Sequence, residues 1–560
     1  MNMRILWKLL TITFLAVLPG CPPKQQAGAV KEWAIIVYMY GSTDFDGDAS
    51  KGARDSIFKM KEVGSTKDFD VIVQFDTGTE KTPTKRYVLT KLVGSNDINN
   101  IVNDIDSKIL SVSLKIPLEN IQHLSSSPTQ AEIQEKINDL TNAQVMVGGE
   151  KKDLGSVLKK VLVTQSAEES FYKGLGLSIG RQTHAGDPTG EDIKAIRDRL
   201  AEKPGKLKAY LLECLLEQDK VGDVGETNVA DPNYLRQFIQ FGMDQYQARH
   251  RMVILWSHSD GFSVTGEHEN NLTIGQLATV LQEIKVPSSP PPHQDNSKIK
   301  IDILGFSECT MGLIENFYRL KNSAEIGIAT EGGTPTRLSW PFDRILKNLE
   351  QNYKMGGQEL ARMIVEEYSK SHKENVRLCS LNETNPVSAF LRCECDLSAL
   401  YISQVTEVIE PLQKLTQLLI QRLTQLLVDP QPKDRWLIDA RHKCQSYAFH
   451  WVDLSEFCQA LKDNQTTKDP AQAKVIADLC DEIMASIHKM VILSASLGTC
   501  APTNGLSTYF PEEACVSINP LYSSSLEIKE IQWVNFLDNY QNLKQKFDHC
   551  IIEKMDGCSN

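Results

Sequence analysis

The sequence predicts an α/β protein with a mostly parallel sheet. Continuous apolar runs of strand length, such as WAIIVYMY at 33–40 and FDVIVQFD at 69–76, alternate with segments of helical spacing. Runs without polar alternation are typical of strands in a parallel sheet that helices cover on both faces. With 560 residues, of which 41% are apolar, the chain can build a large core and two or more domains.

The predicted elements follow in order on either side of an unclear region. A helix is expected at 50–63 and a short exposed strand at 85–89, and the signal then weakens from about 95 to 225. Asp231 and Pro232 open a helix whose apolar residues share one face. Strands and helices then alternate, in the order RMVILW, NLTIGQLATVLQEIK with Thr273 as its cap, IKIDILGF, TMGLIENFYRLKN, AEIGIATEGG and WPFDRILKNLEQ.

The N-terminus has the pattern of an export signal. Arg4 and Lys8 precede a short apolar run, and Cys21 follows Leu-Pro-Gly. The run is too short for a membrane span, so we interpret 1–20 as a signal peptide. Cys21 resembles the lipidated cysteine of bacterial lipoproteins, which would anchor the chain to the lipid bilayer of the cell envelope. Cleavage nearby without a lipid is the alternative.

These observations divide the chain into six parts. A proline-rich loop at 286–298 interrupts the second half of the α/β domain. We expect a signal peptide at 1–20, a tether at 21–32, the first part of the α/β domain at 33–94, an insertion or subdomain at 95–221, the second part of the α/β domain at 222–375 and a C-terminal α/β domain at 376–560. Leucines at helical spacing over 411–429 predict a long core helix, with a partner-binding helix as the alternative.

Charge and cysteine pattern limit the partners. The net charge of −12 argues against nucleic acid, which needs a basic surface. No C-x-x-C pair occurs among the thirteen cysteines, so no metal site is predicted from them. The cysteines of the last third are expected to be structural, as disulfides or as buried thiols: Cys444, Cys458, Cys480, Cys500, Cys515, Cys550 and Cys558.

Two predicted strands end in reactive side chains, His258 and Cys309. Neighbouring parallel strands present their carboxyl ends at one edge of a sheet, so the two residues can meet there. A helix expected to begin near Met311 would lower the pKa of the thiol, and a nearby imidazole would lower it further. We therefore expect Cys309 as nucleophile, His258 as its acid–base partner, and the backbone amides of Ser259 and Cys309 as an oxyanion hole. The alternative is an inert thiol and a surface histidine.

Several blocks, in order, resemble the clostripain family of cysteine peptidases. The blocks are WAIIVYMYGSTDFD, DVIVQFD, GETNVADPNYLRQFIQFGMDQYQARHRMVILWSHSDGF with His258, KIDILGFSECTMGLIENFYRLKNSAEIGIATEGGTP with Cys309, HWVDLSEFCQAL, NGLSTYFP and WVNFLDNY. The resemblance implies a caspase-like three-layer sandwich, the fold of caspases, gingipains and legumains. It also implies a Cys309/His258 dyad that cleaves peptide bonds, typically after Arg or Lys, and members that are often matured by internal cleavage.

The sequence departs from the family pattern around the substrate pocket. The family's acid two residues before the nucleophile is Ser307 here, Glu308 replaces a small residue, and Thr334 replaces an acid before Pro335. The pocket candidates are thus Ser307, Glu308, Glu331 and Thr334. A buried guanidinium without a partner acid costs several kcal/mol, which puts a basic preference in doubt and favours an uncharged side chain.

Three further features follow from the resemblance. Ser259 and Asp260 stand where the family has glycine in the turn, and Asp260 either orients His258 or faces solvent. Calcium is possible by resemblance at Asp44, Asp46 and Asp48, although a solvated acidic loop fits the spacing better. Candidate processing sites between the His and Cys strands are Lys285, Lys298 and Lys300.

The predicted function is that of an exported, lipid-anchored bacterial cysteine endopeptidase. We expect a monomer that acts on peptides or proteins and binds no nucleic acid. The competing prediction is a surface lipoprotein that keeps the caspase-like fold as a binding or scaffold module without turnover.

Overall fold

The computed structural model describes the α/β region and most of the C-terminal region. The described residues are 30–41, 49–77, 83–91, 144–147, 150–153, 216, 219–225, 228–264, 271–285, 301–334, 340–379, 396–428, 435–447, 450–464, 470–496, 503–512, 518, 522 and 530–556. The predicted signal peptide, Cys21, the acidic loop with Asp44, the processing candidates Lys298 and Lys300, and most of the predicted insertion lie outside them.

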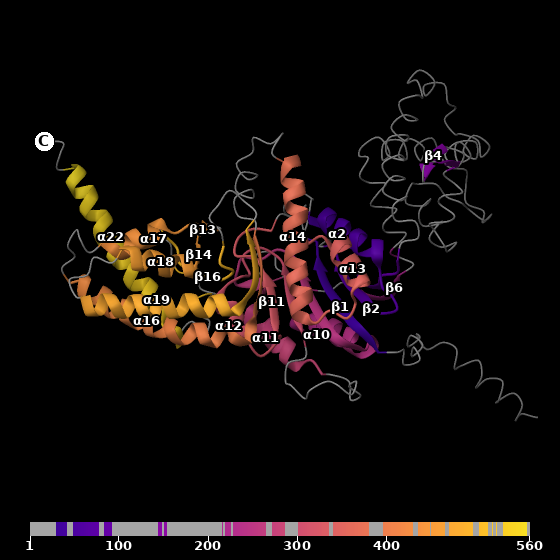
Figure 1. Ribbon diagram of the computed structural model, residues 1–560, viewed down its shortest axis with the longest axis horizontal. Helices are drawn as coiled ribbons and strands as arrows, with labels where there is room; N and C mark the ends of the chain where they lie inside the picture. Colours follow the sequence, from indigo (N-terminus) through magenta and orange to yellow (C-terminus); the bar gives the residue numbers. More distant parts are fainter. Residues whose placement is uncertain are drawn as a thin grey trace, which may run out of the picture.

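A nine-stranded sheet forms the centre of the described chain (Figure 1), in the order β15-β12-β11-β10-β7-β1-β2-β3-β6. Its five middle strands are parallel: β1 (Lys31–Tyr40), β2 (Phe69–Asp76), β7 (Ala248–Trp256), β10 (Ile303–Ser307) and β11 (Ile326–Ala329). Antiparallel strands extend both sides: β3 (Thr84–Val88), β6 (Lys220–Gly225), β12 (Asp396–Tyr401) and β15 (Val491–Ser496). The predicted mostly parallel α/β sheet is confirmed.

Helices cover both faces of this sheet, which gives the expected three layers. In β1 the side chains alternate, so that Trp33 and Ile35 enter one core while Ala34 and Ile36 enter the other. The first core packs against α2 (Ala49–Val63), α13 (Phe342–Gln351) and α14 (Gly357–Cys379). The second packs against α10 (Pro232–Gln245), α11 (Ile274–Glu283), α12 (Ile314–Leu320) and α16 (Val405–Leu426).

The helices α10 and α11 begin at the caps that the sequence predicts. Asp231 caps α10 by accepting a hydrogen bond from the Asn233 amide, and the predicted apolar face of α10 is buried. Thr273 and Gln276 form a capping box at the start of α11. In α16 the leucine stripe is buried in the second core, as predicted for a core helix.

The C-terminal region shares the second core with the sheet. Two of its strands, β12 and β15, are part of the central sheet itself. Its helices α16, α19 and α22 extend to one side of the sheet in Figure 1. The remaining elements of this region are α17 (Trp436–Lys443), α18 (Leu454–Asn464), α19 (Pro470–Met490), α22 (Trp533–Asp556), the 3-10 helix η2 (Ile402–Gln404), and a small sheet of β13 (Ser446–Tyr447), β14 (Trp451–Asp453) and β16 (Ser507–Tyr509).

Two short antiparallel pairs complete the described secondary structure. One pair, β4 (Gln144–Val147) and β5 (Glu150–Asp153), belongs to the predicted insertion. The other, β8 (Ser263–Val264) and β9 (Leu272–Thr273), follows the turn after His258 and leads into α11. This second pair therefore fixes the exit of the chain from the His258 turn.

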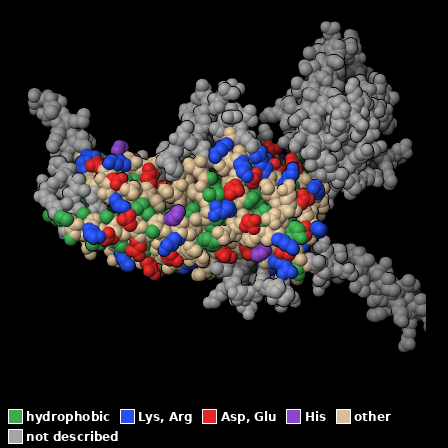
Figure 2. All heavy atoms as spheres, viewed as in Figure 1, with side chains coloured by type: hydrophobic (Ala, Val, Ile, Leu, Met, Phe, Trp, Pro, Cys, Tyr) green, Lys and Arg blue, Asp and Glu red, His purple; other side chains and the backbone are tan. Residues whose placement is uncertain are grey.

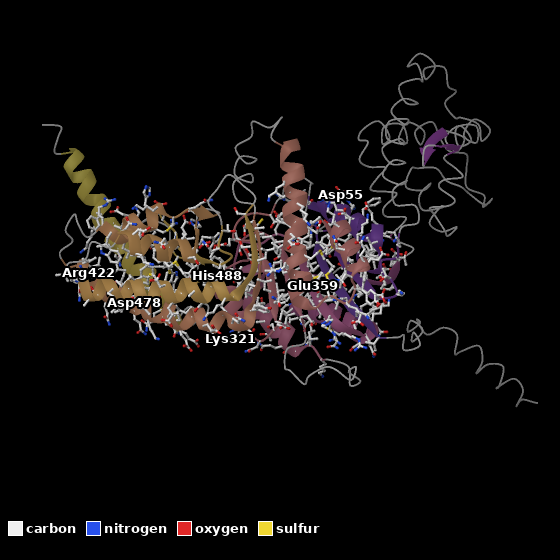
Figure 3. The ribbon with its side chains drawn as sticks, viewed as in Figure 1. Asp55, Lys321, Glu359, Arg422, Asp478 and His488 are labelled. Atoms are coloured by element: carbon white, nitrogen blue, oxygen red, sulfur yellow. The ribbon has the colours of Figure 1, made fainter. Side chains whose placement is uncertain are left out.

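The surface carries both signs of charge. Figure 2 shows Lys and Arg side chains interspersed with Asp and Glu over the face in view. In Figure 3, Glu359 of α14 and Asp478 of α19 are labelled among these outer side chains, and both are exposed. No helix within the described ranges is both long enough and apolar enough to cross a membrane.

A substitution at Gly305 tests how closely β10, the strand before Cys309, packs against the core. A β-carbon at this position would lie 2.5 Å from the buried ring of Trp340. Gly305→Ala should therefore lower the free energy of unfolding by about 1–3 kcal/mol, measured by denaturant unfolding, because the core is overpacked. Gly222→Ala in β6, where nothing lies within 4 Å, is the matched control. Equal stability of the two variants would contradict the close contact.

Candidate active site

His258 and Cys309 follow the carboxyl ends of two neighbouring parallel strands. In the β7–β10 pair, Leu255 lies beside Phe306 and Trp256 beside Ser307. The strands β7 and β10 end at Trp256 and Ser307, and His258 and Cys309 each stand two residues beyond these ends. Both residues therefore belong to the loops at one edge of the sheet. Both side chains are half-buried, so each retains some solvent exposure.

The loops that follow the two strands are joined to each other. The side-chain amide of Asn316 donates to the Gly261 carbonyl at 2.9 Å and to the Met311 carbonyl at 3.3 Å. Ser259 Oγ lies 2.8 Å from the Met311 sulfur. The sequence analysis did not identify Asn316, and the available signal was a pair of polar residues, Glu315 and Asn316, between the apolar Ile314 and Phe317 of α12. These contacts hold the His258 turn against the Cys309 turn.

The expectation that a helix begins near Met311 is wrong. α12 begins at Ile314, and the residues between it and Cys309 are held by other segments. Thr310 has a positive φ of 52°, which is unfavourable for a β-branched residue. Gly312 donates its amide to Thr330 at 2.7 Å and accepts from the Ser507 amide at 2.8 Å. The positive end of α12 is therefore not placed directly at the thiol.

The loop after β11 contacts the thiol through polar groups of Thr334. The Thr334 amide donates to Cys309 Sγ at 3.3 Å, and the thiol lies 3.7 Å from the Thr334 carbonyl. Thr334 Oγ1 donates to the Glu308 carbonyl at 3.0 Å, and the Thr310 amide donates to Gly332 at 2.8 Å. An amide that donates to sulfur stabilises a developing thiolate, so this loop contributes to the nucleophile.

Glu331, on the same loop, is directed into the interior. Its two carboxylate oxygens accept from the Gly505 amide and from Ser507 Oγ, each at 2.6 Å. Asp396 accepts from the Glu331 and Gly332 amides at 2.9 Å, and Asp453 accepts from the Asn504 amide at 2.6 Å. Burial, together with the charges of Asp453 and Asp396, raises the pKa of Glu331 well above its usual range. These buried acids join the nucleophile's loop to the C-terminal region.

The other two pocket candidates directly precede Cys309, with Ser307 as the last residue of β10 and Glu308 just after it. Ser307 is buried, and by register its side chain lies on the face of Trp256. Glu308 is only 1% exposed, and burial followed by the charge of Asp260 raises the pKa of its carboxyl well above the usual range. All four predicted pocket residues thus lie near Cys309 in sequence or space, but Glu331 and Thr334 are already engaged by the protein itself.

His258 lies in a turn after β7 where its side chain is partly buried. Burial lowers the pKa of His258, so the imidazole is uncharged at neutral pH and can accept a proton. Asp260 Oδ1 accepts from the Phe262 amide, the Ser263 amide and Ser263 Oγ, each at 2.9 Å, which caps its own turn. Among described non-glycine residues a positive φ occurs at Thr310 and Gln532, so Ser259 fits the turn without strain.

The structure bears on the metal-binding and disulfide expectations. Among the described residues, no group of three or more His, Cys, Asp or Glu is arranged to hold a metal ion. Cys444, Cys458 and Cys480 are buried thiols, one of the two states expected for them. The acidic loop with Asp44 lies outside the described residues, so calcium stays a prediction there.

A sheet of this kind, with a thiol and an imidazole at adjacent strand ends, is that of a cysteine peptidase with an α/β fold. The model of the clostripain family matches residues 214–543. The chain belongs to the clostripain family and is a cysteine-type endopeptidase. The curated proteins give no match.

Solved structures of the same class are similar to the chain. A secreted C11 cysteine protease from Bacteroides thetaiotaomicron in complex with an irreversible peptide inhibitor has 12% identity and a TM-score of 0.47, covering 90% of this chain and 99% of that one. An inactive zymogen C11 protease from Parabacteroides distasonis has 11% identity and a TM-score of 0.42, covering 92% and 98%. A B. fragilis cysteine protease has 14% identity and a TM-score of 0.30, covering 48% and 98%.

Glu331 should make stability depend on pH. Its pKa is raised in the folded state, so its contribution is fully present below the unfolded value near 4.5 and is lost as pH rises. We expect the free energy of unfolding to fall less steeply between pH 5 and pH 8 in Glu331→Gln than in the native chain. The difference is at most about 1.4 kcal/mol per pH unit. Urea unfolding at several pH values measures it, and the exposed Glu410→Gln is the control. Parallel curves for Glu331→Gln and the native chain would argue against this role.

Proposed function

We propose that the protein is an exported endopeptidase in which Cys309 and His258 form the catalytic dyad. The observation that supports this proposal is the parallel β7–β10 pair, because His258 and Cys309 follow the carboxyl ends of these two neighbouring strands. Their partial exposure leaves room for a substrate, and the Thr334 amide already donates to the sulfur. These features match the needs of an activated thiol nucleophile.

The chemistry would be acyl transfer in two steps. His258, neutral because it is buried, takes the thiol proton, and the Cys309 sulfur attacks the scissile carbonyl carbon. His258 then gives that proton to the leaving amine as the C–N bond breaks, which leaves a thioester. Water, deprotonated by His258, attacks the thioester and releases the new carboxyl group and the thiol. The amides of Ser259 and Cys309 would hold the oxyanion in both steps.

The location of the enzyme is part of the proposal. The basic residues, the short apolar run and Cys21 at the N-terminus support export and lipid anchoring to the cell envelope. The competing proposal, a scaffold lipoprotein without turnover, is favoured by the departures from the family pattern at Ser259, Ser307 and Thr334. The two proposals differ in whether Cys309 reacts with peptide inhibitors.

The dyad is tested by substitution. Cys309→Ala and His258→Ala should each lower kcat/KM on peptide substrates by at least about a thousandfold, because each removes a group that forms or breaks a bond. A thiol-reactive peptide inhibitor should label the native chain and neither variant. Cys444→Ala and His442→Ala, which lie in and just after α17, are matched controls and should keep the label. Labelling of a distal cysteine instead of Cys309 would refute the assignment.

The residue before the cleaved bond should be uncharged. Ser307 replaces the expected acid, Thr334 Oγ1 bonds the Glu308 carbonyl, and both oxygens of Glu331 are bound within the protein. The remaining pocket candidate, Glu308, has a pKa that burial raises well above its usual range. A guanidinium in such a pocket would therefore meet no ionised carboxylate, at a cost of several kcal/mol. A peptide library should therefore show kcat/KM at least about tenfold higher for uncharged than for Arg or Lys residues at this position. Ser307→Asp should raise cleavage after Arg, whereas a native preference for Arg would contradict the proposal.

A further inference from the structure

Glu308 is a buried acid directly before the nucleophile, and its role is not explained by the dyad. It is 1% exposed. Both of its carboxyl oxygens are buried, and neither has a hydrogen-bond partner in the described part of the chain. An ionised carboxylate in such surroundings is costly, since neither solvent nor a partner compensates its charge. The position therefore favours the neutral acid.

The surroundings of Glu308 can be named element by element. Continuing the β7–β10 register by one residue pairs Glu308 with Ser257, whose buried Oγ likewise lacks a partner among the described residues. On the loop after β7, Asp260 is the charged group that acts on Glu308. The nearest titratable residue on its own loop is Cys309, and His258 lies on the loop after β7.

Among the described residues of the other nearby elements, no cation is recorded as acting on Glu308. The loop after β11 presents Thr330 Oγ1 and Thr334 Oγ1 to the Glu308 carbonyl. The acid of that loop, Glu331, is bound by Gly505 and Ser507. In α12, Glu315 is likewise bound elsewhere, by Thr508 at 2.7 Å and Tyr522 at 2.8 Å. Every charged group named here that could act on Glu308 is an acid, so each one opposes its ionisation.

We propose that Glu308 is a positioning residue that must be protonated for Cys309 to work, and that its ionisation turns the thiol off as pH rises. As a neutral acid it adds no charge one residue from the sulfur. As a carboxylate it would oppose formation of the thiolate through like-charge repulsion and would leave a charge unpaired inside the fold. The expected effect on peptide cleavage rests on the proposed function, whereas the expected effect on the reactivity of the Cys309 thiol does not.

Glu308→Gln tests this inference because glutamine keeps the shape and removes the ionisation. The rate of Cys309 alkylation by iodoacetamide is followed by peptide mass spectrometry from pH 5 to pH 10, together with kcat/KM. At low pH the alkylation rates of the variant and the native chain should agree. At alkaline pH the variant should react roughly tenfold faster and keep activity where the native chain loses it. Its melting temperature should exceed the native one increasingly as pH rises, because a buried acid with a raised pKa loses its stabilising contribution with rising pH.

Asp260→Asn provides a second variant with an opposite expectation. Without the Asp260 charge, Glu308 ionises more easily. The pH above which Cys309 is alkylated more slowly than in Glu308→Gln should therefore be lower in Asp260→Asn than in the native chain. In the Glu308→Gln background, Asp260→Asn should not shift the pH dependence of the Cys309 alkylation rate. This double-mutant comparison separates titration of Glu308 from a structural effect on the turn.

Each outcome of these experiments either supports or overturns the proposed role of Glu308. Superimposable alkylation profiles for Glu308→Gln and the native chain would overturn the inference. So would a selective loss of cleavage after Arg or Lys in Glu308→Gln, which would make Glu308 a charged pocket residue. If the native chain shows no peptide turnover but its alkylation profile changes as expected, the proposed function fails and the inference about Glu308 stands.

Discussion

The register between β7 and β10 is the constraint on which the site depends. The two strands are neighbours in the middle of the sheet, and their buried side chains enter both cores. A slip of one residue would turn every side chain of a strand to the opposite face. It would expose Leu255 or Phe306 to the wrong core and would separate His258 from Cys309. Core burial and active-site geometry are therefore specified by the same pattern of side chains.

The C-terminal region is the second support of the site. Ser507 of β16 binds both the Gly312 carbonyl and Glu331, so a single residue contacts the turn after the nucleophile and the loop that contacts its sulfur. On α12, Glu315 receives hydrogen bonds from Thr508 and Tyr522. Each of these carboxyls is removed from water and accepts hydrogen bonds from partners that are distant in sequence. Loss of the C-terminal packing would hydrate them and release the loops they hold.

Most of the fold could be predicted because its signals are local. Strand runs, the apolar face of α10 and the Thr273 capping box depend on a few consecutive residues, and all three are confirmed. The start of α12 could not be predicted in this way. It is set by hydrogen bonds from Gly312 to Thr330 and from Ser507 to Gly312, which join residues far apart along the chain.

The site was predictable to the level of the two strand ends and no further. His258 and Cys309 follow from the rule that parallel strands collect reactive groups at one edge. The commitment of Glu331 to Gly505 and Ser507 depends on where the C-terminal region folds, which spacing does not reveal. The same holds for Asn316, whose partner Gly261 lies on the other strand's turn.

The charge state of the site follows from burial. Burial lowers the pKa of His258 and raises the pKa of Glu308 and Glu331, so all three favour their neutral forms. For the proposed dyad, an uncharged imidazole means that His258 starts as a proton acceptor, and charge on it forms only when it takes the thiol proton. The stabilisation must then come from groups already aimed at the developing charge, and the Thr334 amide at 3.3 Å from the sulfur is one of them.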